Sequence, residues 1–163
     1  MPKEPRKKPL LSVNATITDN RRARYDYAVE ETFEAGIVLT GTELKSLRLG
    51  QGSLNEAHAG MKQGELFLMG MHIPEYAPAG AHLQHTPRAD RKLLLHKREV
   101  ARLVGSISRD GYTLIPLKMY FNARGRAKVL LGVAKGKKNI DRRETIKARD
   151  WNRQKQRLMK DRG

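Results

Sequence analysis

The sequence contains no cysteine. This absence excludes a disulfide scaffold, a thiolate zinc site, an iron–sulfur cluster and a thiol nucleophile. Long apolar runs are also missing, because the longest aliphatic runs, Ile37–Leu39 and Leu93–Leu95, are far shorter than the ~20 residues that a membrane-spanning helix needs. The N-terminus has no apolar stretch of signal-peptide length, so we expect a cytoplasmic protein that does not bind membranes.

Positive charge, in contrast, is abundant and unevenly distributed. The 163 residues include 33 Lys and Arg against 17 Asp and Glu, a net charge of +16. Residues 1–24 carry +5 and residues 135–163 carry +8, whereas residues 25–134 carry only +3 and hold every Phe and Tyr. We therefore expect a disordered basic arm (1–18), a compact domain (19–134), and a basic tail (135–163) that is disordered when free and helical on its partner.

Alternating apolar residues in the middle segment predict strands. We expect one long bent strand over 25–39 with a bulge at Gly36, a hairpin of 57–61 with 66–71 around Gln63 and Gly64, and a second hairpin of 113–121 with 126–133. Pro116 indicates a bulge or an edge position in its strand.

Two short helices are expected between these strands. Thr42 is positioned to cap the first, which ends at Gly50, and the second covers 96–104 with Gly105 as its stop. Hairpins with two or three short helices in about 110 residues predict a mainly β fold, a small closed or nearly closed barrel.

Enzymatic motifs are weak. His82 and His85 have a metal-like spacing but lie in a Pro- and Gly-rich loop without a third ligand, so we expect exposed loop histidines. Glu30 and Glu31 should face opposite sides of a strand, which prevents them from acting as an acid–base pair. The glycines of 49–53 lack the Lys and Ser/Thr of a phosphate loop. We expect no catalytic residue, no metal and no cofactor.

Features for RNA binding are stronger. The segment Asn20–Arg24 leads into Tyr25 and Tyr27, which combines guanidinium groups for phosphates with rings for stacking. Tyr27 fits a core position better, whereas Tyr25 fits either role. Further cations surround Leu93–Leu95 and continue in the segment 135–138. Each basic run alone could be a solvated face, but together they favour an RNA partner.

Six ordered segments closely resemble the SsrA-binding protein family, also called small protein B: Asn20–Tyr25, Glu34–Gly36, Gly41–Arg48, Arg91–Leu95, Gly132–Lys138 and Asp141–Arg143. The resemblance covers residues from about 20 to 160. It implies an oligonucleotide-binding (OB)-type antiparallel β-barrel with about three α-helices, and a non-enzymatic function. Such a protein binds the tRNA-like part of transfer-messenger RNA and, with elongation factor Tu, delivers it to stalled 70S ribosomes for trans-translation.

The resemblance also implies roles for individual residues. RNA binding falls to Asn20, Arg22, Arg24, Tyr25, Glu34, Lys92, Leu93, Leu94, Lys128, Lys137 and Lys138. The residues expected to contact the small-subunit decoding centre are Asp141, Arg142 and Arg143. The residues expected to act in the empty messenger channel are Ile146, Trp151, Leu158, Met159 and Lys160. Ile140 departs from the polar or aromatic residue of many relatives, which puts a stacking role there in doubt.

Glu34 can be interpreted in two ways. Its carboxylate can accept from a base amino group or a ribose 2′-hydroxyl, or it can form an ion pair with a nearby Arg. Two other functions remain open for the whole chain: a structural ribosomal or general RNA-packaging protein, and a metal-dependent nuclease.

Overall fold

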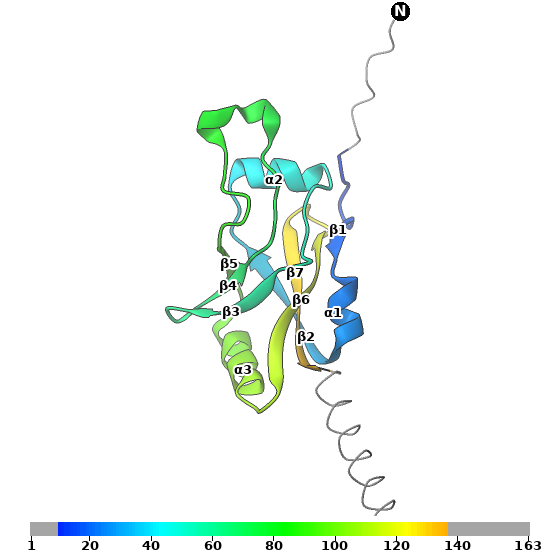
Figure 1. Cartoon of the computed structure of the whole chain (residues 1–163), viewed down its shortest axis with the longest axis vertical. Helices are drawn as coiled ribbons and strands as arrows, with labels where there is room; N and C mark the ends of the chain where they lie inside the picture. The colour runs from blue at the N-terminus through cyan, green and yellow to red at the C-terminus, as the bar shows by residue number, and fades with distance from the viewer. Residues whose placement is uncertain (1–9, 137–163) are drawn as a thin grey trace, which may run out of the picture.

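The structure, a computed structural model, describes residues 10–136. This part of the chain forms seven strands, three α-helices and two short 3₁₀ turns (Figure 1). The strands are β1 (Thr16–Asp19), β2 (Tyr27–Ile37), β3 (His58–Lys62), β4 (Glu65–Met69), β5 (Arg91–Leu94), β6 (Tyr112–Phe121) and β7 (Ala127–Gly136). The helices are α1 (Arg21–Asp26), α2 (Gly41–Arg48) and α3 (Lys97–Ile107), and the turns are η1 (Ala77–Ala79) and η2 (Ala81–Leu83).

The strands form one antiparallel sheet in the order β1-β6-β7-β2-β5-β4-β3. The sheet curls so that β3 comes close to β6, but no hydrogen-bonded pairing joins these two strands within residues 10–136. The predicted mainly β, OB-like fold with short helices is therefore confirmed, whereas the hydrogen-bonded sheet remains open instead of closing into a barrel. α2 and α3 lie at opposite ends of the sheet, and α1 lies beside β6 (Figure 1).

Both predicted hairpins are present. β3 and β4 are joined by Gln63 and Gly64, which both have positive φ, as a two-residue hairpin turn requires. β6 and β7 are joined by a turn in which the Asn122 side chain accepts from two backbone N–H groups. The register of β6 shifts between Pro116 and Lys118, so Leu117 is the bulged residue. Of the two positions expected for Pro116, the structure shows a bulge directly after the proline and not an edge strand, because β6 lies between β1 and β7.

The first long strand begins later than the sequence pattern predicts. Residues 21–26 form α1, and β2 starts only at Tyr27. Asn20 caps α1, because its side-chain oxygen accepts from the Ala23 N–H at 3.2 Å. Ala23 then packs against β6 in a small second cluster with Ile115, Leu117 and Ala134. This packing outweighs the alternation that favours a strand.

Glu30, and not Gly36, is the bulged residue of β2, since the register with β7 shifts between Val29 and Glu31. The bulge turns Glu30 and Glu31 toward the same hollow beside α3, so the expectation that they face opposite sides is wrong. Glu30 accepts from the Tyr112 hydroxyl at 3.0 Å, and Glu31 forms an ion pair with Arg102 at 2.7 Å.

The other two helices differ from prediction at their ends. Thr40, not Thr42, caps α2, and the Thr40 N–H donates in turn to Glu43 at 2.9 Å. Gly50 follows this helix with a φ of 75°, as expected of a helix stop. α3 continues through Gly105 to Ile107, so Gly105 does not end it.

A buried ion pair fastens α2 to β5 and to the long loop before it. Arg91 and Glu43 are both buried, and the Arg91 guanidinium also donates to the Met71 carbonyl at 2.9 Å. His85 bonds Thr42 Oγ1 and the Ile73 carbonyl, both at 2.9 Å. His85 is therefore a partly buried link and not the exposed loop residue that we expected; His82 is exposed.

Within the described ranges, no group of three metal-ligating side chains comes together, and no helix is long and apolar enough to cross a membrane. β1 begins at Thr16, inside the segment 1–18 assigned to the first arm, and β7 ends at Gly136, two residues beyond the expected domain end. The division of the chain into arm, domain and tail stays a prediction.

Candidate nucleic-acid interface

Polar and charged side chains gather on one face of the sheet. The side chains that point away from the core alternate with the buried Phe33, Ala35, Val129, Leu131 and Met119. They are Glu34 of β2, Lys128 and Leu130 of β7, and Lys118 and Tyr120 of β6. The strand register aligns Tyr120, Lys128, Gly36 and Leu94 in one row across four strands. A neighbouring row contains Lys118, Leu130 and Glu34. We call these two rows the outer face.

Gly36 keeps the centre of the outer face flat. A Cβ atom at this position would lie 3.3 Å from the Leu94 Cβ and 3.7 Å from the Lys128 Nζ. Leu94 of β5 and the Lys128 ammonium group of β7 therefore occupy the space beside Gly36 that a side chain would need. The absence of a side chain at Gly36 brings an apolar group and a positive charge together on an accessible surface.

On β5, Lys92 lies on the same side of the strand as Leu94, next to the outer face. Leu94 is 50% exposed, although it is adjacent in sequence to the buried core residue Leu93. Lys92 forms an exposed ion pair with Glu65 at 3.0 Å. An exposed ion pair of this kind contributes little stability, so it holds the Lys92 side chain only weakly.

Glu34 is the carboxylate of the outer face. Its Oε2 accepts a hydrogen bond from the Tyr120 hydroxyl, and the Lys118 ammonium lies 5.1 Å from the centroid of the Tyr120 ring. Burial, together with the hydrogen bond and negative charge of Glu34, raises the pKa of the Tyr120 hydroxyl well above its ordinary value. The hydroxyl therefore remains a proton donor throughout the neutral range.

Helix α1 borders the outer face. It packs on Leu117 and Ile115 of β6, next to the row that contains Lys118 and Leu130. Tyr25 is 79% exposed on this helix, Arg22 pairs with Asp26 at 3.7 Å, and Arg24 pairs with Asp19 at 3.9 Å. These exposed groups supply charge and one accessible ring beside the sheet.

The structure places two of the expected RNA contacts in the interior. Asn20 is 5% exposed, and its amide donates to the Pro116 carbonyl at 3.0 Å while its oxygen caps α1. Leu93 is 3% exposed and belongs to the main core. Both side chains are therefore engaged within the protein, and their expected contact with RNA stays a prediction. Arg22, Arg24, Tyr25, Glu34, Lys92, Leu94 and Lys128 have accessible side chains.

The remaining expected site residues lie outside the described residues. They are Lys137, Lys138, Asp141, Arg142, Arg143, Ile146, Trp151, Leu158, Met159 and Lys160.

Sequence reasoning missed Lys118 and Tyr120. Both alternate with the buried Met119 and Phe121 in a segment that was correctly predicted as a strand, so the alternation alone could have placed them on the accessible side. What the alternation could not show is that Tyr120 reaches across β7 to Glu34.

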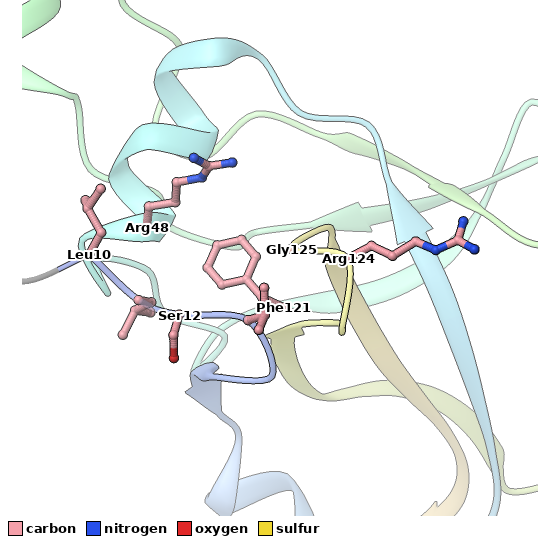
Figure 2. Close-up of a pocket in the computed structure, with 8 residues that line it drawn as sticks. Leu10, Ser12, Arg48, Phe121, Arg124 and Gly125 are labelled. Carbon is pink, nitrogen blue, oxygen red and sulfur yellow. The ribbon is translucent and has the colours of Figure 1, made fainter.

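Among the hollows of the described residues, two that lie away from the outer face differ in size. The larger, with a volume of about 390 Å³, lies between Leu10–Val13, the end of α2 and the β6–β7 turn, with Arg48 and Arg124 on opposite sides of Phe121 (Figure 2). The smaller, of about 250 Å³, lies beside α3 and is lined by Glu30, Glu31 and Tyr112 among others.

Comparisons with known proteins agree on one family. The family model described as "SmpB protein" matches residues 17–161. The SsrA-binding protein of Sphingomonas elodea is 54% identical over 148 residues, which cover 91% of this chain and 92% of that protein. The SsrA-binding protein of Rhodospirillum rubrum is 52% identical over 153 residues, covering 94% and 96%.

A solved structure gives the same result. A chain in the structure described as "tmRNA-SmpB: a journey to the center of the bacterial ribosome" is 50% identical to this chain, with a TM-score of 0.61. The match covers 79% of this chain and 85% of that chain.

Proposed function

The chain belongs to the SmpB protein family, and from this premise we propose that it binds the tRNA-like part of transfer-messenger RNA and delivers that RNA to stalled ribosomes for trans-translation. The observation that carries the proposal is the outer face, whose two rows combine Lys118, Lys128 and Leu94 with the carboxylate of Glu34. A surface that only attracted phosphates would gain nothing from a carboxylate at its centre.

The groups on the outer face divide RNA binding into two parts. The lysines, together with Arg22 and Arg24 of α1, contact phosphates and supply affinity that falls with salt. Leu94 and the ring of Tyr25 offer apolar contact and stacking to bases. Glu34 accepts from a base amino group or a 2′-hydroxyl and so supplies orientation.

The basic tail carries the ribosomal part of the proposed function. Lys137 and Lys138 extend the RNA contacts, and Asp141, Arg142 and Arg143 contact small-subunit RNA in the decoding centre. Ile146, Trp151, Leu158, Met159 and Lys160 act within the empty messenger channel, where a charged segment gains structure by coupled folding. The support for this division is the charge of +8 over residues 135–163 in a segment with few apolar residues.

The same proposal includes elongation factor Tu as a partner in the delivery complex and the cytoplasm as the location, since the ribosome is the destination. It includes no chemical step, so no catalytic residue or cofactor is assigned.

The RNA that copurifies with the full chain tests the proposal. We expect one abundant tRNA-like species. Ribosomal or mixed RNA in proportion to its abundance would instead identify a structural ribosomal or general RNA-packaging protein.

Lys128→Ala and Lys62→Ala form a matched pair for locating the RNA surface. Both remove one lysine, but Lys128 lies on the outer face and Lys62 lies on the β3–β4 hairpin, where it pairs with Asp90 at 2.8 Å. We expect Lys128→Ala to lower the slope of log affinity against log salt by about one for transfer-messenger RNA. Lys62→Ala should leave the slope unchanged, and equal effects would exclude the outer face as the binding surface.

A further inference from the structure

Tyr120 and Glu34 meet across an intervening strand. In the sheet β7 separates β6 from β2, and Tyr120 and Glu34 pair with Lys128 and Leu130 respectively. The Tyr120 hydroxyl donates to Glu34 Oε2. Glu34 Oε1 has no hydrogen-bond partner within residues 10–136, and Glu34 forms no ion pair there. One carboxylate oxygen is therefore held by the protein, and the other is available.

The partner of Glu34 is neutral, which matters for recognition. A Lys or Arg partner would cancel the negative charge of the carboxylate, whereas a phenolic hydroxyl fixes its orientation and leaves the charge in place. Burial and the Glu34 carboxylate raise the pKa of Tyr120 above its ordinary value, so the hydroxyl keeps its proton and its role as donor. The ring is held in turn by Lys118, whose Nζ lies 5.1 Å from its centroid.

A fixed negative charge among lysines discriminates between the groups of an RNA. It repels a phosphate oxygen and accepts a hydrogen bond from a base amino group or a ribose 2′-hydroxyl. The discrimination depends on orientation, because a carboxylate that swung toward Lys128 would form an ion pair and lose its selectivity. The lysines supply affinity for any RNA, and the oriented carboxylate supplies a penalty for the wrong contact.

We propose that Tyr120 is a positioning residue for RNA recognition, which orients the Glu34 carboxylate so that its second oxygen accepts from a donor group of the bound RNA. This inference rests on the proposed function of the outer face. The inference gives Tyr120 a role in which its hydroxyl does not contact the RNA. Tyr120 instead sets the selectivity of Glu34, which does contact the RNA.

Tyr120→Phe tests the inference, because it removes the hydroxyl and keeps the ring under Lys118. The full chain is titrated with transfer-messenger RNA and, separately, with an unrelated structured RNA of equal length. We expect about 5-fold weaker binding to transfer-messenger RNA, from the loss of an oriented charged acceptor, and unchanged binding to the unrelated RNA. The ratio of the two affinities is the readout, since a loss of folded protein would lower both equally.

The chain provides a closely matched control. The Tyr112 hydroxyl donates to Glu30 at 3.0 Å, and Arg109 and Lys135 lie 5.3 and 4.7 Å from its ring centroid. Tyr112 thus has the same chemistry as Tyr120 but lies beside α3, away from the outer face. Tyr112→Phe should leave the affinity ratio unchanged.

Glu34→Gln separates the inference from the proposed function. If Glu34→Gln leaves the ratio unchanged, the proposed role of Glu34 in orienting the RNA is wrong and the positioning role of Tyr120 is lost with it, while Lys128→Ala still tests the outer face as the binding surface. If Glu34→Gln lowers the ratio and Tyr120→Phe does not, the positioning role alone is overturned. In the double variant we expect no loss beyond that of Glu34→Gln, and a further 5-fold loss would show that Tyr120 acts independently of Glu34.

Discussion

At the scale of single residues, neighbours in sequence have opposite roles in β5. Arg91 and Leu93 point inward, where Arg91 meets Glu43 and Leu93 joins the core, while Lys92 and Leu94 point outward. The period of two in a strand produces this separation. Leucine-to-alanine substitutions at these two neighbouring positions therefore test different properties. The substitution at Leu93 tests the stability of the domain, and the substitution at Leu94 tests the function of its surface.

Leu93→Ala should lower the free energy of unfolding by about 2–5 kcal/mol, because it leaves a cavity in the core. Leu94→Ala should change stability by less than about 1 kcal/mol, since half of its surface is already exposed. It should nevertheless weaken transfer-messenger RNA binding about 5-fold through lost apolar contact. Urea unfolding and RNA titration of both variants measure the two effects. A Leu94→Ala protein that binds normally would remove Leu94 from the proposed interface.

The sequence could not show which leucine of this run is the core residue. Residues 93–95 are all leucine, so residue type cannot distinguish the core position from the exposed one. The resemblance to the family implied RNA contact for both Leu93 and Leu94. Asn20 posed the same difficulty. Its amide is suited to RNA contact, but the helix that it caps and the Pro116 carbonyl that it reaches are evident only in the folded chain.

At the scale of elements, the local patterns predicted strands better than helix boundaries. The hairpins follow from alternation and turn residues, which are local signals. α1 was missed because six residues cannot show a helical period, and its stability comes from a cap and from packing on β6. α3 continues through Gly105 because the cost of one glycine within a helix, about 1 kcal/mol, is small.

Thr40 provides the test at this scale. Its capping box with Glu43 starts α2, and the two carboxylate oxygens of Glu43 serve the cap and the buried Arg91 separately. Thr40→Ala should cost about 1 kcal/mol of stability in urea unfolding, whereas Thr40→Ser, which keeps the hydroxyl, should cost little. Equal losses from the two substitutions would mean that packing of the methyl group, and not the cap, starts the helix.

At the scale of the whole molecule, charge is divided between a nearly balanced middle segment and strongly basic ends. Residues 25–134 carry +3, yet the outer face concentrates lysines around one carboxylate. The division indicates two different tasks. We propose that the nearly balanced domain recognises its RNA by chosen contacts, and that the +8 over residues 135–163 attracts dense arrays of phosphates such as those of the ribosome.

Deletion of everything after Lys138 tests this division of labour. The shortened chain keeps the outer face, α1 and all residues of the sheet, so its affinity for transfer-messenger RNA should remain within about 3-fold of the full chain at physiological salt. Tagging on stalled ribosomes in a reconstituted translation assay should be abolished, because Asp141, Arg142 and Arg143 and the tail residues are gone. The full-length variant with Arg142→Ala and Arg143→Ala distinguishes the effect of these two charges from the effect of shortening the tail. This variant should bind transfer-messenger RNA normally, and its tagging activity on stalled ribosomes should be low. A large loss of RNA affinity in the shortened chain would instead mean that the residues after Lys138 bind the same RNA as the outer face, and the proposed division of labour would be wrong.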